Sequence, residues 1–77
     1  MGEDIEEHDI VVLLTDIPEE KLRTGDVGTV VFIHNNGEAF EVEFPNPGGD
    51  PRYIVATVLR EAVLKLRNME RFARAAG

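Results

Sequence analysis

Closely spaced carboxylates are the residues of this sequence with the clearest chemical potential. Glu38, Glu41 and Glu43 lie in a segment that alternates with the apolar residues Phe40, Val42 and Phe44. A carboxylate pair performs acid–base chemistry where burial separates the two pKa values. A period of two instead places Glu41 and Glu43 together on the solvent side of a strand. The segment therefore predicts an acidic surface, which the acidic loop over residues 16–20 extends, rather than an active site.

Other side chains that act on substrates or hold metals are scarce. The chain has no serine and no cysteine, and its four threonines fall in predicted strands or turns, so the usual nucleophiles are nearly absent. His8 and His34 have no partner at metal-ligand spacing. We expect no catalytic residue, no metal site and no cofactor, and we predict that the protein is not an enzyme.

The C-terminal residues combine arginines with an apolar stripe. Arg67, Arg71 and Arg74 recur at helical spacing and are candidate phosphate contacts. The apolar side chains of this region are candidate protein contacts, namely Leu66, Met69 and Phe72. Because a short helix is marginal alone, this segment must pack on something. Three alternatives remain open for the surface on which it packs: its own domain, a groove on a partner, or a second copy of the chain. The edge of a strand offers a second binding mode, in which a partner pairs with it through backbone hydrogen bonds.

The distribution of charge favours a protein partner over nucleic acid. The net charge is −7; residues 1–50 hold 13 acidic and two basic residues, whereas residues 51–77 hold two acidic and six basic ones. An acidic surface repels phosphates, so we do not expect nucleic acid as the main partner. The acidic part attracts either its own basic tail or a basic protein, and the sequence leaves both readings open.

The sequence also predicts where the protein resides. No apolar run approaches the roughly 20 residues of a membrane helix, and the acidic opening residues differ from a secretory signal. The absence of cysteine fits a reducing compartment. We expect a cytoplasmic protein without a membrane partner.

Four stretches have the apolar patterns of strands, over residues 8–14, 27–34, 38–44 and 53–59. The first contains an unbroken apolar run, which suits either a strand buried on both faces or the first strand of a barrel. Between the first two, Leu22 is the expected apolar anchor of a long loop.

Glycines mark the turns that connect these stretches. Gly25 and Asp26 form a turn before the second stretch, and Gly28 lets that strand bend where a Cβ would collide. Asn36 and Gly37 are a strong hairpin signal between the second and third stretches.

The last residues have two interpretations. In the first, residues 60–62 form one 3₁₀ turn, residues 63–66 form a fifth strand and a short helix covers residues 68–75. In the second, residues 60–75 form one helix, which the helix propensities of this segment favour. We favour the first, because a five-stranded barrel needs its last strand to cover an open edge. The predicted organisation is a flexible acidic N-terminus over residues 1–7, a barrel over 8–67 and a C-terminal helix or tail over 68–77.

The order of these motifs resembles a family of small bacterial proteins known mainly as a domain of unknown function. The resemblance covers residues 8–66 and rests on the segments Asp9–Leu13, Asp16–Pro18, Leu22–Val31, Glu38–Phe44 and Val55–Val58. It implies a mostly β fold, a small SH3-like barrel of about five strands. The portion from Gly25 to Val31 is also similar to the KOW motif and to the barrel of the nitrile hydratase β subunit. Members of the family often sit beside other small proteins in arrangements like those of toxins and antitoxins.

The sequence thus predicts a non-catalytic protein-interaction module, antitoxin- or immunity-like, that binds a basic protein partner. Two alternatives remain. One is a KOW-like module that associates with RNA or the ribosome through its arginines, and the other is a structural homo-oligomer built through the C-terminal helix.

Overall fold

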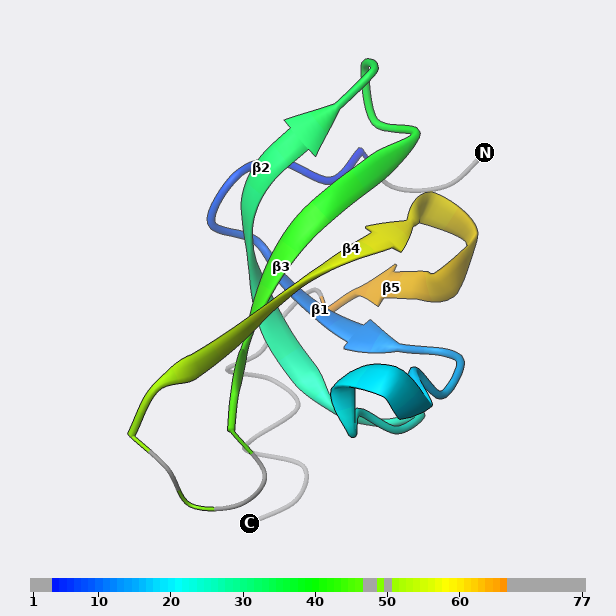
Figure 1. The fold of residues 1–77 in the computed structure, drawn as a ribbon. Coiled ribbons are helices and arrows are strands. Elements are labelled where there is room, and N and C mark those ends of the chain that lie inside the picture. Colours follow the sequence, from blue (N-terminus) through cyan, green and yellow to red (C-terminus); the bar gives the residue numbers. More distant parts are fainter. Residues whose placement is uncertain (1–3, 47–48, 50, 67–77) are drawn as a thin grey trace, which may run out of the picture.

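The fold is a single sheet of antiparallel strands, seen in a computed structural model that describes residues 4–46, 49 and 51–66 (Figure 1). The five strands lie in the order β4-β3-β2-β1-β5. Their bounds are Ile10–Leu13 (β1), Val27–His34 (β2), Ala39–Pro45 (β3), Tyr53–Leu59 (β4) and Val63–Lys65 (β5). The mostly β architecture with five strands is confirmed, and the predicted strand over residues 53–59 is confirmed at both ends.

The core lies on one face of the curved sheet and comes from alternate residues of the strands. Phe40, Val42 and Phe44 of β3 are all buried, as the period of two predicts. The other buried apolar residues are Val11, Leu13, Leu22, Val30, Ala56, Val58 and Val63. Burying each large apolar side chain contributes about 1.5–3 kcal/mol, so β3, with two phenylalanines, makes the largest single contribution.

The apolar run of β1 alternates in burial. Val11 and Leu13 are fully buried, whereas Ile10 and Val12 are half-buried and Leu14 is exposed. The expectation of a strand buried on both faces is therefore wrong, because Ile10 and Val12 on the outer face of β1 are only partly buried. β1 is the first strand of the sheet and has one core-facing side.

The segment after β4 forms a turn and a strand rather than a continuous helix. η2 (Arg60–Ala62) is a 3₁₀ turn, and β5 pairs antiparallel with β1. Tertiary packing overrides the helix propensity here, because Val63 is buried in the core and β5 covers the edge of β1. A helix over residues 60–75 is thus wrong for residues 60–65. The described part of the chain holds no α-helix, and the predicted helix over residues 68–75 lies outside the described residues.

The loop between β1 and β2 folds back on itself around one apolar side chain. It contains the 3₁₀ turn η1 (Pro18–Glu20). Ile17 and Leu22 exchange backbone hydrogen bonds of 2.9 and 3.1 Å, and Leu22 is 1% exposed. Leu22 is therefore the anchor that the sequence predicts.

The predicted turns form where the backbone requires a left-handed conformation. Gly25 has a φ of +98°, and its N–H donates to the carbonyl of Leu13 over 2.8 Å. In the hairpin, Asn36 and Gly37 have φ values of +59° and +100°. The Gly37 N–H closes this turn on His34 over 2.9 Å.

Gly28 lies on β2 where a side chain would collide with β3. A Cβ at this position would lie 2.7 Å from side-chain carbons of both Phe44 and Val42, and 2.8 Å from the carbonyl oxygen of Glu43. Real Cβ atoms do not tolerate such distances, so a glycine is needed here for steric reasons, as predicted.

We expect Gly28→Ala to destabilise the protein by about 1–3 kcal/mol, the range for forcing extra atoms into a packed core. For a domain of this size each kcal/mol lowers the thermal midpoint by about 4–8 °C, so calorimetry measures the effect directly. Val27→Ala is the control, because Val27 is an exposed residue next to Gly28 on the same strand and surface substitutions change stability little. Equal melting of wild type and Gly28→Ala would contradict the steric argument.

Candidate functional site

The face of β2, β3 and β4 that points away from the core carries the candidate site. Because side chains alternate along a strand, burying Phe40, Val42 and Phe44 turns the intervening residues of β3 outward. The cross-strand partners of these residues share the same face. We call this surface the outer face; it includes Thr29, Phe32, His34, Ala39, Glu41, Glu43, Tyr53, Val55, Thr57 and Leu59.

Glu41 lies at the centre of the outer face and is held from both sides. Its Oε2 accepts a hydrogen bond of 2.7 Å from the Thr57 hydroxyl on β4, and lies 2.7 Å from Nε2 of His34 on β2. The His34 ring, followed by the Thr57 hydroxyl, holds the pKa of the Glu41 carboxyl below its usual value, while partial burial opposes this shift. Glu41 is therefore a positioned anion that connects three strands.

Glu43 is a second carboxylate on the same face. It lies opposite Thr29 on β2 and Val55 on β4, and no hydrogen bond or ion pair joins it to another described residue. Glu38 lies just before β3 and is exposed, and its carbonyl oxygen accepts the N–H of Arg60 over 3.0 Å. The structure thus brings Glu41 and Glu43 together on one face and leaves Glu38 at the end of the strand.

Exposed apolar side chains surround the two carboxylates. Phe32, Tyr53, Val55 and Leu59 are each between 51% and 62% exposed. Single exposed apolar residues are ordinary on a protein surface, but a cluster on one face indicates an interaction site. The sequence alone did not predict this cluster, because residues 53–59 are apolar on both faces of the strand except at Thr57, so no alternation marks Tyr53, Val55 and Leu59 as exposed.

Phe32 reaches this face through an irregularity in the pairing of β2 with β3. The register shifts between Val30 and Phe32, so two residues of β2 occupy the place of one. Val30 points into the core, and a strict period of two would also bury Phe32. The bulge instead turns Phe32 outward, where its ring packs edge-on against His34 with centroids 4.9 Å apart.

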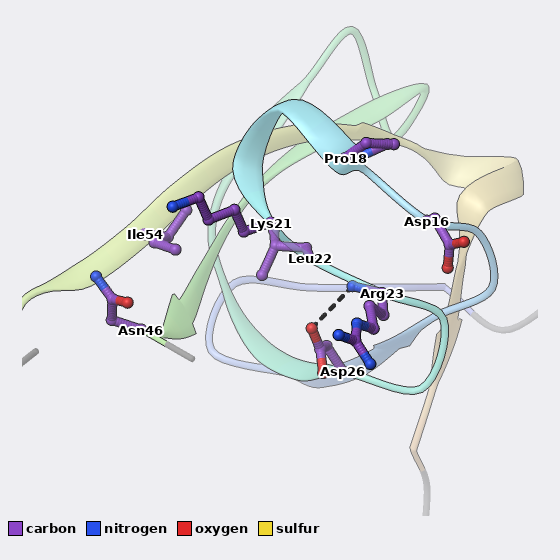
Figure 2. Close-up of a pocket in the computed structure, with 8 residues that line it drawn as sticks. All are labelled: Asp16, Pro18, Lys21, Leu22, Arg23, Asp26, Asn46 and Ile54. Carbon is purple, nitrogen blue, oxygen red and sulfur yellow. Dashed lines mark hydrogen bonds between the residues drawn. The ribbon is translucent and has the colours of Figure 1, made fainter. Parts of the chain in front are cut away.

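A separate groove lies between the η1 loop and the ends of β3 and β4 (Figure 2). The carboxylates of this groove accept hydrogen bonds from residues of the loop between β1 and β2. Asp16 accepts hydrogen bonds from the backbone N–H and the hydroxyl of Thr24, and these bonds lower the pKa of Asp16. Asp26 accepts the N–H of Arg23 over 2.9 Å. The groove is lined by Asp16, Pro18, Lys21, Leu22, Arg23, Asp26, Asn46 and Ile54.

The remaining predicted residues fall at or beyond the end of β5. Leu66 is half-buried, and its N–H donates to the carbonyl of Ile10 over 2.9 Å, so it continues the pairing of β5 with β1. The other candidates lie outside the described residues, namely Arg67, Met69, Arg71, Phe72 and Arg74. Among residues 4–46, 49 and 51–66, no three metal-ligating side chains gather, and no helix has the length and apolarity to cross a bilayer.

A family model described as a domain of unknown function, DUF4926, matches residues 7–65. No curated protein and no solved structure matches the chain.

The hydrogen bonds to Glu41 predict a specific dependence of stability on pH. Because its folded-state pKa is lowered from an ordinary 4.5, Glu41 stabilises the fold above that pH, and this contribution is lost as the pH falls through the folded-state pKa. We expect Glu41→Gln to cost less than about 1 kcal/mol at pH 7, as solvent-accessible pairs do. We also expect the free energy of unfolding, measured by urea titration, to differ less between pH 7 and pH 3 in Glu41→Gln than in the wild type.

Glu43→Gln is the control for this experiment, since it removes the same charge without removing these hydrogen bonds. If Glu43→Gln changed the pH profile as much as Glu41→Gln does, general charge rather than the Glu41 contacts would be responsible.

Proposed function

The chain belongs to the DUF4926 family of domains of unknown function, and for this member we propose a non-catalytic protein-interaction module that binds a basic protein partner through the outer face. The observation that carries the proposal is the placement of Glu41 and Glu43 within a cluster of exposed apolar side chains. Aromatic residues are enriched in protein interfaces, where they bury large areas at a low cost in conformational entropy.

The two kinds of side chain have different physical roles in this proposal. The carboxylates attract a basic surface over a distance comparable to the Debye length, about 8–10 Å at physiological salt, and they raise the association rate more than the affinity. Phe32, Tyr53 and Val55 supply the apolar area that holds the complex together once formed. The partner that fits this face has lysines or arginines beside apolar side chains.

The fixed position of Glu41 strengthens this preference. Its hydrogen bonds to Thr57 and His34 hold the carboxylate in place before the partner arrives, so less side-chain entropy is lost on binding. A neutral or acidic partner would leave Glu41 and Glu43 desolvated without a counter-charge, which is costly. The outer face therefore selects against such partners.

Our proposal extends to the fold and the setting of this module. The 3₁₀ turn η2 joins the Leu59 end of β4 to the start of β5, which supports an SH3-like barrel in which these two strand ends approach one another, while the Tyr53 end of β4 runs away from β5 (Figure 1). We propose an antitoxin- or immunity-like role in a bacterial cytoplasm. An acidic face suits the masking of a basic, nuclease-like surface, and a chain without cysteine suits a reducing compartment.

An affinity experiment with a charge-matched control tests the function. The full chain is immobilised, bound proteins are identified by mass spectrometry, and the purified partner is titrated calorimetrically. We expect a basic partner whose affinity falls at least about tenfold, equivalent to about 1.4 kcal/mol, for the double variant Glu41→Gln/Glu43→Gln. The control is Glu7→Gln/Glu61→Gln, which removes the same charge from exposed residues outside the outer face.

Two results would contradict the proposed function. One is equal loss of affinity in both double variants, because general charge would then suffice. The other is binding that is unchanged in 1 M salt, where the Debye length is only about 3 Å.

A further inference from the structure

The two edges of the sheet differ in how well they are protected against pairing with another chain. β4 and β5 are the end strands of the five-stranded order. β5 has three residues and includes Lys65, whose Nζ forms an ion pair of 3.2 Å with Asp9. β4 has seven residues, Tyr53–Leu59, and none of them is charged or a proline. Short length, charge and proline are the usual devices that block edge pairing, so β5 carries two of them, whereas Tyr53–Leu59 carries none.

The pairing register shows which backbone groups of β4 point outward. The N–H of Arg60 donates to the carbonyl of Glu38 over 3.0 Å, which continues the register of β3 and β4. Hydrogen-bonded and non-bonded pairs alternate in an antiparallel sheet, so the next bonded pairs contain the alternate residues Val58, Ala56 and Ile54. The residues between these direct their N–H and C=O groups away from β3, namely Tyr53, Val55, Thr57 and Leu59.

These same residues present their side chains on the outer face. Tyr53, Val55 and Leu59 are exposed, and the first half of β4 runs along the outside of the molecule in Figure 1. β3 is the only strand neighbour of β4 in the described part of the chain. One strand therefore offers both main-chain hydrogen-bonding groups and apolar side chains to an incoming segment.

We propose that the basic partner binds by strand addition, with one extended segment pairing along the free edge of β4. This inference rests on the proposed function and specifies how the outer face is used. Side chains on the outer side of the added strand would lie beside Val55 and Thr57, two strand spacings from Glu43 and Glu41, which is about 9.5 Å. Lysine and arginine have the length to span much of this distance. The segment that fits therefore alternates basic with apolar residues.

A basic partner fits this edge better than a second copy of the chain. Pairing of β4 with another β4 would bring two chains of net charge −7 together, with Glu41 and Glu43 of each copy on either side of the seam. Like charges across an interface disfavour association. The same carboxylates attract a basic segment, so charge complementarity decides between the two occupants.

A peptide library selected on the immobilised full chain tests this inference. Random nine-residue peptides are displayed on phage, and enriched sequences are synthesised and titrated. We expect alternation of lysine or arginine with β-branched or aromatic residues. In amide hydrogen exchange, the bound peptide should slow the N–H groups of Val55 and Thr57 at least about tenfold and leave Ala56 unchanged, because the Ala56 N–H already faces β3.

Two variants separate main-chain pairing from side-chain attraction. N-methylation of alternate residues removes peptide N–H donors but keeps every side chain, and we expect it to weaken binding at least about tenfold. Val55→Pro removes one outward N–H from an edge strand, a position that tolerates proline, and should have a similar effect. Val55→Thr keeps the backbone N–H and changes only the side chain, so we expect Val55→Pro to weaken binding more than Val55→Thr does.

The outcomes distinguish the two proposals. If basic peptides bind but N-methylation has no effect, or if the enriched peptides are helical or proline-rich, strand addition is wrong and the proposed function stands. If acidic peptides or none are enriched, both are wrong. Light scattering provides the last test. If the full chain is a dimer and Val55→Pro is a monomer, the edge of β4 binds a second copy and the inference is wrong.

Discussion

The strict alternation of β3 couples the core of this protein to its surface. Phe40, Val42 and Phe44 fill the interior, and because successive side chains point to opposite faces, Glu41 and Glu43 must lie outside. A one-residue slip of this strand would bury two carboxylates and expose two phenylalanines. The free energy of core packing therefore fixes the positions of the carboxylates. Gly28 tightens the constraint, because it allows β2 to approach β3 at the level of Phe44 and Val42.

The bulge in β2 gives the outer face its second component. Without the register shift between Val30 and Phe32, the phenylalanine would compete for space in a core that is already filled by β3. With the shift, Phe32 and His34 turn outward together, and His34 reaches Glu41 across the strand boundary. A local irregularity thus converts a simple row of carboxylates into a mixed acidic and apolar surface. Bulges are commonly found where a strand must redirect a side chain.

Local patterns in the sequence predicted the elements, while contacts between distant segments determined the site. Residues 27–34 and 53–59 are β-rich and bounded by turn residues, so their limits follow from propensity and turn chemistry alone. The cluster that includes Phe32 depends on a bulge that exists only when β2 pairs with β3. Glu41 acquires its fixed position from His34, seven residues away, and Thr57, 16 residues away. No periodicity records such contacts, because they arise when three strands align in one register.

The net charge of −7 makes the long uncharged edge of β4 compatible with a protein that does not pair with itself. A charge well away from zero opposes self-association at long range, so β4 does not need a lysine or a proline of its own to block a second copy. This electrostatic protection of the β4 edge is selective, since it does not repel a segment that carries positive charge. In the binding mode that we propose, the same acidity that disfavours the pairing of two copies favours a basic strand, so an edge that would otherwise be an aggregation hazard becomes a specific binding element.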